Sequence, residues 1–388
     1  MRRGSSVATV LLLAAALLSC SSSSEPDEDR DTEPPPPSAE PLPTPSTEPP
    51  RVPSATELPG RDVWLQFADE RNAFALLTVC ETDSGPCAFR LAVLEDGIGW
   101  ELRDTPLPAA DPDGRHHNME VAGPGSARVS AQHEDGTVES WLTTDGGRTW
   151  QPAGAAADGT AEEIPEGAEL SLGDGIRVLM PDTAEYRRLA EQPPLADLTW
   201  PAATGDGSYW TSGTDPDTGE RAIALTEDRG RGWRVLAPLP TPAGHEDAQT
   251  REVVAGPGGV LYAFETGVVM TDVFSGSSAE LLVAVHRSED RGESWERVWT
   301  GGGGATPRSL LGTPIAAADD TLTVYADDGI YTSHDHGRSF DVTRPGPPPE
   351  EPDLTRAGYL LRDLGIPGHY RISADGFTWH TLILGGNA

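Results

Sequence analysis

Four stretches of the sequence carry an aspartate at the same place in an eight-residue pattern: 143–150, 226–233, 288–295 and 333–340. A hydroxyl residue precedes this aspartate by two positions, a glycine follows it by two and an aromatic residue by five. Recurring carboxylates could be catalytic, but these residue types also suit a tight turn between strands. The aspartate accepts backbone N–H groups of the turn, the glycine adopts a positive φ, and the aromatic side chain is buried. We therefore interpret the aspartates as structural: Asp145, Asp228, Asp290, Asp335 and, in a shorter pattern, Asp375.

Arginines and histidines between these patterns are the candidates for ligand binding. Guanidinium groups that converge could hold a carboxylate, sulfate or phosphate, and histidines beside acidic residues could bind a metal or act as a base. Acidic neighbours could instead pair with the arginines at a rim, and the histidines could be solvated loop residues. The candidates are Arg61, Arg115, His116, His117, His245, Arg251, Arg308 and Arg356. No calcium loop is recognisable, so we expect no metal and no cofactor.

The charge of the chain limits its partners. The 388 residues carry a formal net charge of −34, and all 28 basic residues are arginine. A field of this sign repels nucleic acid, so we expect no nucleic-acid partner. The lack of lysine also excludes chemistry through a lysine Schiff base.

The patterns recur at a spacing that suits a repeated sheet. Three weaker versions fill the gaps, ending at Trp100, Tyr186 and Trp379, and the seven aromatic positions are then roughly 35 to 60 residues apart. Alternating apolar residues between them predict about four short strands in each interval, and no amphipathic helix competes with this interpretation. We predict an all-β fold, a seven-bladed β-propeller over residues 60–388, with six blades as the alternative.

The strand order predicts which face of the propeller binds ligands. Because successive strands alternate in direction, the patterned turns lie on the same face as the turns between first and second strands. The connections between blades lie on the opposite face, and they are the longest loops, which favours that face for binding. Five arginines are predicted to precede first strands there: Arg61, Arg115, Arg251, Arg308 and Arg356.

The patterned turns resemble the Asp-box, or BNR, repeats found in sialidase-like propellers, sortilin-type receptors and photosystem II assembly factors. The resemblance covers about residues 61–388 and implies a fold more than a function, because these repeats occur in enzymes and non-enzymes. Sialidases resemble one another in an arginine triad, a tyrosine with a glutamate partner, an acid aspartate and an early R-I-P sequence. The nearest match, Tyr370–Ser373, lacks the proline and lies in the last blade. No catalytic residue is therefore carried over.

The first residues have the features of an export signal. Arg2 and Arg3 precede an apolar run, 7–18, that is too short for an ordinary transmembrane helix. The run ends in Leu-Leu-Ser-Cys, which resembles a bacterial lipobox and implies lipid attachment at Cys20. We expect a lipoprotein signal peptide over 1–19, a disordered linker rich in Pro, Ser and Glu over 20–59, and anchoring of the protein to the cell membrane at the cell surface. A secreted protein with an incidental cysteine is the alternative.

Two further cysteines flank a turn-rich segment between two alternating runs. In an exported chain, Cys80 and Cys87 are expected to form a disulfide across a hairpin. Closing so short a loop should contribute roughly 2 to 3 kcal/mol.

Together these features favour a lipid-anchored, monomeric propeller that binds an envelope protein or a glycan without catalysis. An exported sialidase-like glycoside hydrolase with a diverged site is the first alternative, and an assembly factor for a membrane complex is the second. The hydrolase hypothesis requires the arginines to converge at the channel mouth beside a carboxylate and a tyrosine.

Overall fold

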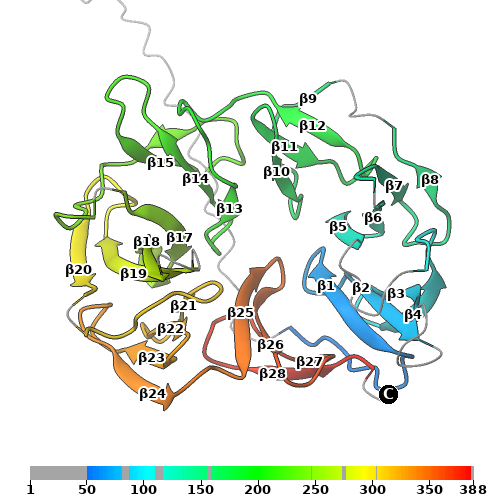
Figure 1. The fold of residues 1–388 in the computed structure, drawn as a ribbon. Helices are drawn as coiled ribbons and strands as arrows, with labels where there is room; N and C mark the ends of the chain where they lie inside the picture. Colours follow the sequence, from blue (N-terminus) through cyan, green and yellow to red (C-terminus); the bar gives the residue numbers. More distant parts are fainter. Residues whose placement is uncertain are drawn as a thin grey trace, which may run out of the picture. The chain divides into compact units, whose positions relative to one another are not determined.

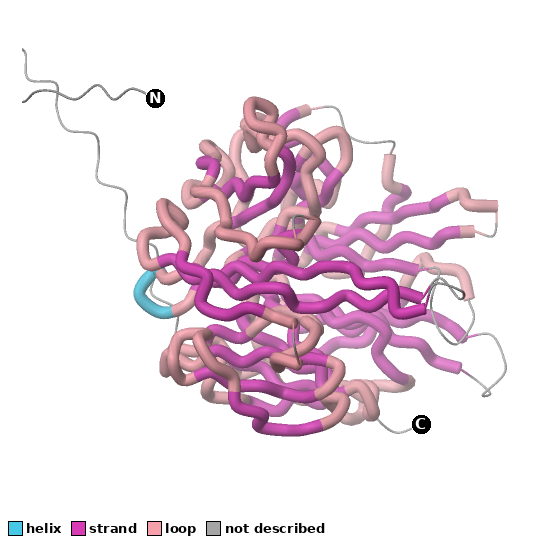
Figure 2. Tube along the Cα trace, turned by 60° about the vertical axis from the view of Figure 1, so that its left-hand side comes forward, coloured by secondary structure: helices cyan, strands magenta, loops and turns pink. Residues whose placement is uncertain are grey.

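The computed structural model describes residues 50–80, 87–109, 117–133, 135–154, 159–245, 247–272, 277–302 and 304–385. Within these residues, 28 strands form seven four-stranded sheets, arranged as the blades of a β-propeller (Figure 1). Strands make up nearly all of the regular structure (Figure 2). The fold class predicted from the sequence is confirmed, with seven blades and not six.

The first four blades have the following strands. Blade one contains β1 (Arg61–Phe67), β2 (Ala73–Cys80), β3 (Cys87–Glu95) and β4 (Gly99–Asp104), and blade two contains β5 (His117–Gly123), β6 (Ser126–Gln132), β7 (Val138–Thr143) and β8 (Gln151–Pro152). Blade three contains β9 (Thr160–Ala161), β10 (Leu170–Leu172), β11 (Ile176–Leu179) and β12 (Tyr186–Leu189), and blade four contains β13 (Ala202–Ala203), β14 (Tyr209–Thr214), β15 (Arg221–Thr226) and β16 (Arg234–Val235).

The remaining three blades follow in chain order. Blade five contains β17 (Gln249–Ala255), β18 (Leu261–Asp272), β19 (Ser277–Ser288) and β20 (Glu296–Thr300), with the 3-10 helix η1 (Pro257–Gly259) between its first two strands. Blade six contains β21 (Ile315–Ala316), β22 (Leu322–Ala326), β23 (Gly329–Ser333) and β24 (Asp341–Pro345), and blade seven contains β25 (Glu350–Thr355), β26 (Gly358–Asp363), β27 (His369–Ser373) and β28 (His380–Ile383). No helix in the described part of the chain is long and apolar enough to cross a membrane.

The hydrophobic cores lie between adjacent blades. The first six residues of β2 are all buried, because both faces of a middle strand pack against neighbouring blades. The outermost strand β24, by contrast, is exposed along its whole length. One core joins blades one and two through Leu76, Leu91 and Met119, all of which are fully buried. The alternating apolar residues of the sequence are therefore the residues that pack between adjacent blades.

The patterned turns, which we call box turns, are held by their aspartates. Asp145 Oδ1 accepts hydrogen bonds from the Thr143 hydroxyl at 2.8 Å and the Thr149 N–H at 2.9 Å, and Oδ2 accepts one from the Thr149 hydroxyl at 2.6 Å. Although partial burial of Asp145 acts in the opposite direction, these bonds from Thr149 and Thr143 lower its pKa to about 2. The other four aspartates each accept the hydroxyl two residues earlier at 2.7 to 2.9 Å: Asp228, Asp290, Asp335 and Asp375.

The box turns mark one end of the blades. The Gly146 N–H in the blade-two box turn donates to the carbonyl oxygen of Gly125, in the β5–β6 turn, at 2.7 Å. The Ala318 N–H after β21 likewise donates to the Asp375 carbonyl oxygen at 2.8 Å. Box turns and first-to-second-strand turns therefore share a face, as the strand order predicts. We call this face the box end and the opposite face the loop end.

Blade three differs from the others in the direction of its inner strand. Its sheet order is β10-β11-β12-β9, and β9 pairs parallel to β12 at the outer edge. The β11–β12 connection lies at the box end, because the Ser126 hydroxyl of the β5–β6 turn donates to the Pro181 carbonyl oxygen at 2.5 Å. Strand β10 therefore runs from the box end to the loop end, as second strands do elsewhere. Within the described ranges, no strand of blade three corresponds to the first strand of the other blades.

The ring closes through a segment before the first blade. Residues 50–58, which we call the strap, pack against blade seven, with Val52 fully buried. The Ala55 N–H donates to the Ile383 carbonyl oxygen at 2.8 Å, and the Trp100 Nε1–H of blade one donates to the Pro53 carbonyl oxygen at 2.7 Å. The expected end of the linker at residue 59 is therefore too late, since 50–59 belongs to the packed domain. Among the described residues, the start of the domain adds no strand to the sheet of blade seven, although Ala55 forms an isolated parallel bridge with Leu384.

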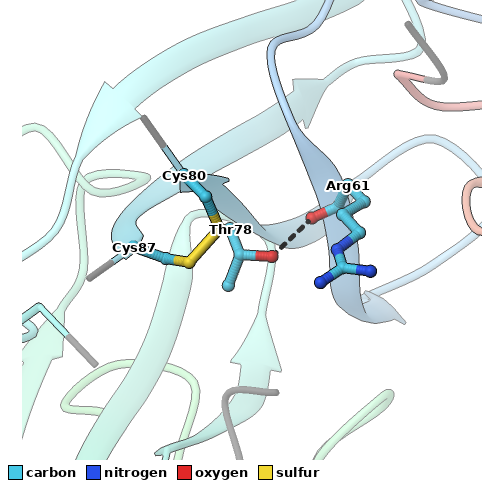
Figure 3. Close-up of a disulfide and its surroundings, with 4 residues drawn as sticks. All are labelled: Arg61, Thr78, Cys80 and Cys87. Carbon is cyan, nitrogen blue, oxygen red and sulfur yellow. Dashed lines mark hydrogen bonds between the residues drawn. A yellow bond between two sulfur atoms is a disulfide. The ribbon is translucent and has the colours of Figure 1, made fainter. Parts of the chain in front are cut away.

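A disulfide joins β2 and β3 at the loop end. Cys80 and Cys87 are bonded, with their Cα atoms 4.1 Å apart, beside Thr78 and Arg61 (Figure 3). The disulfide predicted from the sequence is confirmed.

Candidate functional site in the central channel

The inner strands of the blades surround the axis of the ring (Figure 1). They are β1, β5, β10, β13, β17, β21 and β25. In most blades the inner strand ends at the box end, so the position of a residue along its strand gives its depth in the central channel. Asp353, in the middle of β25, is exposed to solvent, although burial raises its pKa. Both observations fit a water-containing channel with protein on all sides.

Arg356 closes the box end of the channel. It lies in the turn between β25 and β26, and its Nη1 donates to the carbonyl oxygens of Val121 at 2.8 Å and Phe67 at 3.3 Å. Its Nη2 donates to Glu169 Oε2 at 2.8 Å. One side chain of blade seven thus contacts blades one, two and three. Burial lowers the pKa of Arg356 and raises that of Glu169, and the attraction between the two charges opposes both effects.

Two further contacts complete this closure. A Cβ atom on Gly167, which precedes β10, would lie 2.6 Å from the Ala68 carbonyl oxygen of blade one, so only glycine fits there. On the far side, Leu354 of blade seven lies in van der Waals range of a Cβ built on Gly205 in blade four. The channel therefore has one mouth, at the loop end.

Two carboxyl groups lie at mid-depth in the channel. Glu252 is in the middle of β17 and is partly buried, and Asp353 occupies a similar depth in β25. Burial raises the pKa of Glu252 to about 7, with the positive charge of Arg251 acting against this shift and the negative charge of Asp353 adding to it. A carboxyl group with a pKa near neutrality can donate or accept a proton, and both groups can hydrogen-bond hydroxyl groups of a ligand.

A second polar set lies between blades two and three. The Tyr186 hydroxyl donates to Glu120 Oε1 at 2.8 Å, and Arg128 Nε lies 4.0 Å from Glu120 Oε2. Burial raises the pKa of Tyr186, as does the neighbouring Glu120 carboxylate. This tyrosine is therefore protonated at neutral pH and is not an activated nucleophile.

A shallow depression lies beside the loop end of the channel. Its volume is about 400 Å³, and it lies between the β10–β11 turn and the segment that leads into blade four. The inner segment of blade four continues through Trp200, whose side chain is 61% exposed. Its indole offers solvent a flat apolar face and a polar N–H.

One buried polar set is remote from the solvent. His286 Nε2 lies 2.6 Å from Glu265 Oε2, and the Thr241 hydroxyl donates to Glu265 Oε1 at 2.7 Å. His286 is fully buried and Glu265 almost so, which leaves no room for a ligand. This set therefore joins β18 and β19 to the loop from blade four. In the described ranges, no group of three or more His, Cys, Asp and Glu residues could hold a metal ion.

The candidate arginines do not share a site. Arg61 and Arg308 are exposed, and Arg251 is 58% exposed, with its Nε 3.9 Å from Glu280 Oε1. The prediction that Arg356 precedes the first strand of its blade was wrong, because it follows β25 and points into the box end. A slip of one strand end moves a residue to the opposite face of a propeller, since successive strands alternate in direction. The described arginines have different partners and do not converge on one ligand.

The two candidate histidines that the structure describes, His117 and His245, do not line the channel. His117, the first residue of β5, is buried against Phe89, with ring centroids 4.2 Å apart. His245 is exposed in the loop between blades four and five. Arg115, His116 and Cys20 lie outside the described residues.

Comparison with known proteins identifies no family and no particular activity. No family model and no curated protein matches the sequence. A gluconolactonase from Xanthomonas campestris is similar in structure, with 14% identity, 89% of this chain and 99% of that chain covered, and a TM-score of 0.34. The propeller domain of the Trilobed protease from Pyrococcus furiosus is 8% identical, with 82% of this chain and 97% of that chain covered and a TM-score of 0.39. An α-L-arabinofuranosidase from Fusarium graminearum is 12% identical, with 82% of this chain and 89% of that chain covered and a TM-score of 0.30. At TM-scores this low the likenesses carry no argument about this chain.

The channel carboxyl groups were not among the candidates from the sequence. Glu252, Asp353 and Glu169 are three of the 62 acidic residues, and the sequence spacing alone does not distinguish them from the others. A usable signal does exist, because a charged residue in the middle of a first strand must face either a core or the channel. Finding it requires the strand boundaries of each blade.

Proposed function

We propose that the protein is a lipid-anchored, extracytoplasmic propeller that binds a glycan of the cell envelope in its central channel, without catalysis. The observation that carries this proposal is the pair of mid-depth carboxyl groups, Glu252 and Asp353, in a channel with one mouth. Carboxyl oxygens accept hydrogen bonds from sugar hydroxyls, and the exposed indole of Trp200 offers a flat apolar face for a sugar ring.

A glycan array tests this proposal. The full-length protein, purified in detergent, is applied to oligosaccharides of one to six sugars at pH 7.5, and Glu252→Ala and Asp353→Ala are compared with wild type. We expect wild-type binding to a defined set of glycans and at least a tenfold loss of affinity in either variant. Phe377→Ala, which removes an aromatic side chain that is 63% exposed in the blade-seven box turn, is the matched control. Equal binding by all four proteins would reject the channel as the site.

A glycoside hydrolase is the second candidate, favoured by one observation. The pKa of Glu252, about 7, is typical of a general acid, and Asp353 could serve as the second carboxylate. This arrangement does not use the arginine cluster expected of a sialidase-like site. Product release from bound oligosaccharides by wild type, abolished in Glu252→Gln with binding retained, would establish the hydrolase and refute the non-catalytic proposal.

The lipid anchor at Cys20 is tested separately. In Cys20→Ala the proposed site of lipid attachment is removed, so we expect the protein to move from the membrane fraction to the soluble fraction after cell fractionation. Cys80→Ala is the control, because it breaks the disulfide and leaves Cys20 in place. Unchanged membrane association of Cys20→Ala would refute lipidation.

A further inference from the structure

The depression lies at the loop end of blade three, beside the segment that leads into blade four. Strand β10 ends at Leu172 at the loop end, and the chain there turns away from the axis through Gly173–Gly175. The facing wall comes from the segment that leads into blade four, where Leu195 and Leu198 lie close to Gly213 of β14.

The lining of the depression is mixed in character. Three leucines form its apolar wall, while Arg188 and Asp197 are exposed polar groups at its surface. The Gln192 amide is held in place, since its Oε1 accepts the Ile176 N–H at 2.7 Å and its Nε2 donates to the Leu189 carbonyl oxygen at 2.7 Å. A volume of about 400 Å³ with apolar walls and polar groups at the edge suits roughly one or two sugar units.

The residues that line the depression are followed in the sequence by residues of the inner strand of blade four. Leu198 lines the depression, Trp200 follows it with an exposed side chain, and β13 then takes the innermost position in blade four. Because Arg356 and Glu169 close the box end, a ligand can enter and leave only at the loop end. A chain molecule therefore cannot pass through the ring.

We infer that the glycan site continues from the channel across Trp200 into the depression, so that the protein recognises the end of a short oligosaccharide. The terminal sugar lies beside Glu252 and Asp353, and the following units extend over Trp200 toward Leu172 and Leu198. This inference rests on the proposed function and adds a ligand class, a chain terminus with up to three units in contact.

The test uses oligosaccharides of one to six sugars, each printed on the array twice, once coupled through its reducing end and once through its non-reducing end. For wild type we expect affinity to rise from one to three units, to level off beyond that, and to survive in only one of the two orientations. Trp200→Ala should weaken binding of the trisaccharide at least tenfold and binding of the single sugar less than twofold. Leu198→Asn should behave in the same way, and Phe377→Ala should change neither.

Different results separate the inference from the proposed function. Equal binding in both orientations, or a trisaccharide affinity that Trp200→Ala and Leu198→Asn leave unchanged, would overturn the inference and leave glycan binding intact. Binding to no glycan at all would overturn both. Circular dichroism melting curves confirm folding, and because Trp200 is mostly exposed its substitution should leave the melting temperature within a few degrees of wild type.

Discussion

At the scale of single residues, the carboxyl group of Glu252 determines the pH at which the channel changes its charge. Below about pH 7 this group is protonated and can donate a hydrogen bond, and above that pH it is a carboxylate that only accepts. Its burial therefore makes both the ligand chemistry and the stability of the protein depend on pH. The substitution Glu252→Gln tests this dependence, because the glutamine side chain has nearly the same shape and carries no charge.

We predict that Glu252→Gln stabilises the protein in alkaline solution and has little effect in acid. The folded-state pKa is raised from 4.5 to about 7, so the folded protein binds the proton more tightly than the unfolded chain does. The corresponding stability is fully present below pH 4.5 and is lost as the pH rises through 7. Urea unfolding should show Glu252→Gln more stable than wild type by about 2 kcal/mol at pH 8.5 and nearly equal to it at pH 4.5.

Glu220→Gln provides the control for this experiment. Glu220 is exposed in the β14–β15 turn, so its neutralisation should leave the difference between the two pH values unchanged. A Glu252→Gln curve that runs parallel to wild type at all pH values would show that the carboxyl group is not buried in the channel.

The sequence predicts some residue roles well and others poorly, for a geometric reason. The box aspartates are local, since each contacts residues within four positions of itself, and their hydrogen bonds follow from the pattern alone. Arg356 and Glu252 act over long distances in the chain. Arg356 meets Phe67 across nearly the whole domain, and nothing near residue 356 encodes that contact. Channel residues are therefore visible only once the strand ends are known.

At the scale of elements, the box turn is a unit of stability that repeats with variations. The Asp145 carboxylate accepts three hydrogen bonds, while the Gly147 N–H donates to the Thr143 hydroxyl at 2.8 Å. Removing the carboxylate leaves these donors without their acceptor at a turn that joins the last two strands of blade two. The weak repeat around Asp182 has lost its glycine, so it offers a natural comparison.

We predict that Asp145→Ala lowers the free energy of unfolding by about 2 kcal/mol at pH 7, measured by urea denaturation. Because the pKa of Asp145 is about 2, the stability from its carboxylate is present above pH 4 and is lost as the pH falls through 2. The difference between variant and wild type should therefore shrink in strong acid. Asp182→Ala, at an exposed position of the weak repeat, should change stability by less than about 0.5 kcal/mol. Equal losses in the two variants would contradict the distinction between them.

Blade three shows how far element patterns can be predicted. The spacing of the aromatic residues predicts a blade near Tyr186, and a four-stranded sheet is found there. The reversed direction of β10 and the parallel edge strand β9 are not visible in the sequence, because strands of two or three residues carry no measurable alternation. Their placement follows from tertiary contacts such as that between Ser126 and Pro181.

At the scale of the whole molecule, Arg356 holds the blades together at the axis. Its guanidinium group lies among acceptors from three other blades, and 18% of its side chain is exposed. Removing it leaves the Glu169 carboxylate, whose side chain is 38% exposed, without its partner, and it leaves two carbonyl oxygens without a donor.

We predict that Arg356→Ala destabilises the protein by about 2 to 3 kcal/mol in urea denaturation, because two carbonyl oxygens lose their donor while water partly screens the charge of Glu169. Arg356→Ala combined with Glu169→Gln should recover part of this loss, because the unpaired charge is then removed. Arg338→Ala is the control: this box-turn arginine pairs with Glu296 at 2.8 Å but is 45% exposed, so its loss should cost less than about 1 kcal/mol. A cost for Arg356→Ala no larger than that of the control would refute its role at the axis.

The position of Arg356 also sets an order on the assembly of the ring during synthesis. Its acceptors at Phe67, Val121 and Glu169 belong to the first three blades and leave the ribosome long before residue 356 does. The strap has the same relation to the chain end, since Ala55 bonds with Ile383. A nascent chain can thus form separate sheets. The contacts of Arg356 at the axis and those between the strap and blade seven form only after the last blade has been made. The ring can therefore close only after the last strand of blade seven has been made.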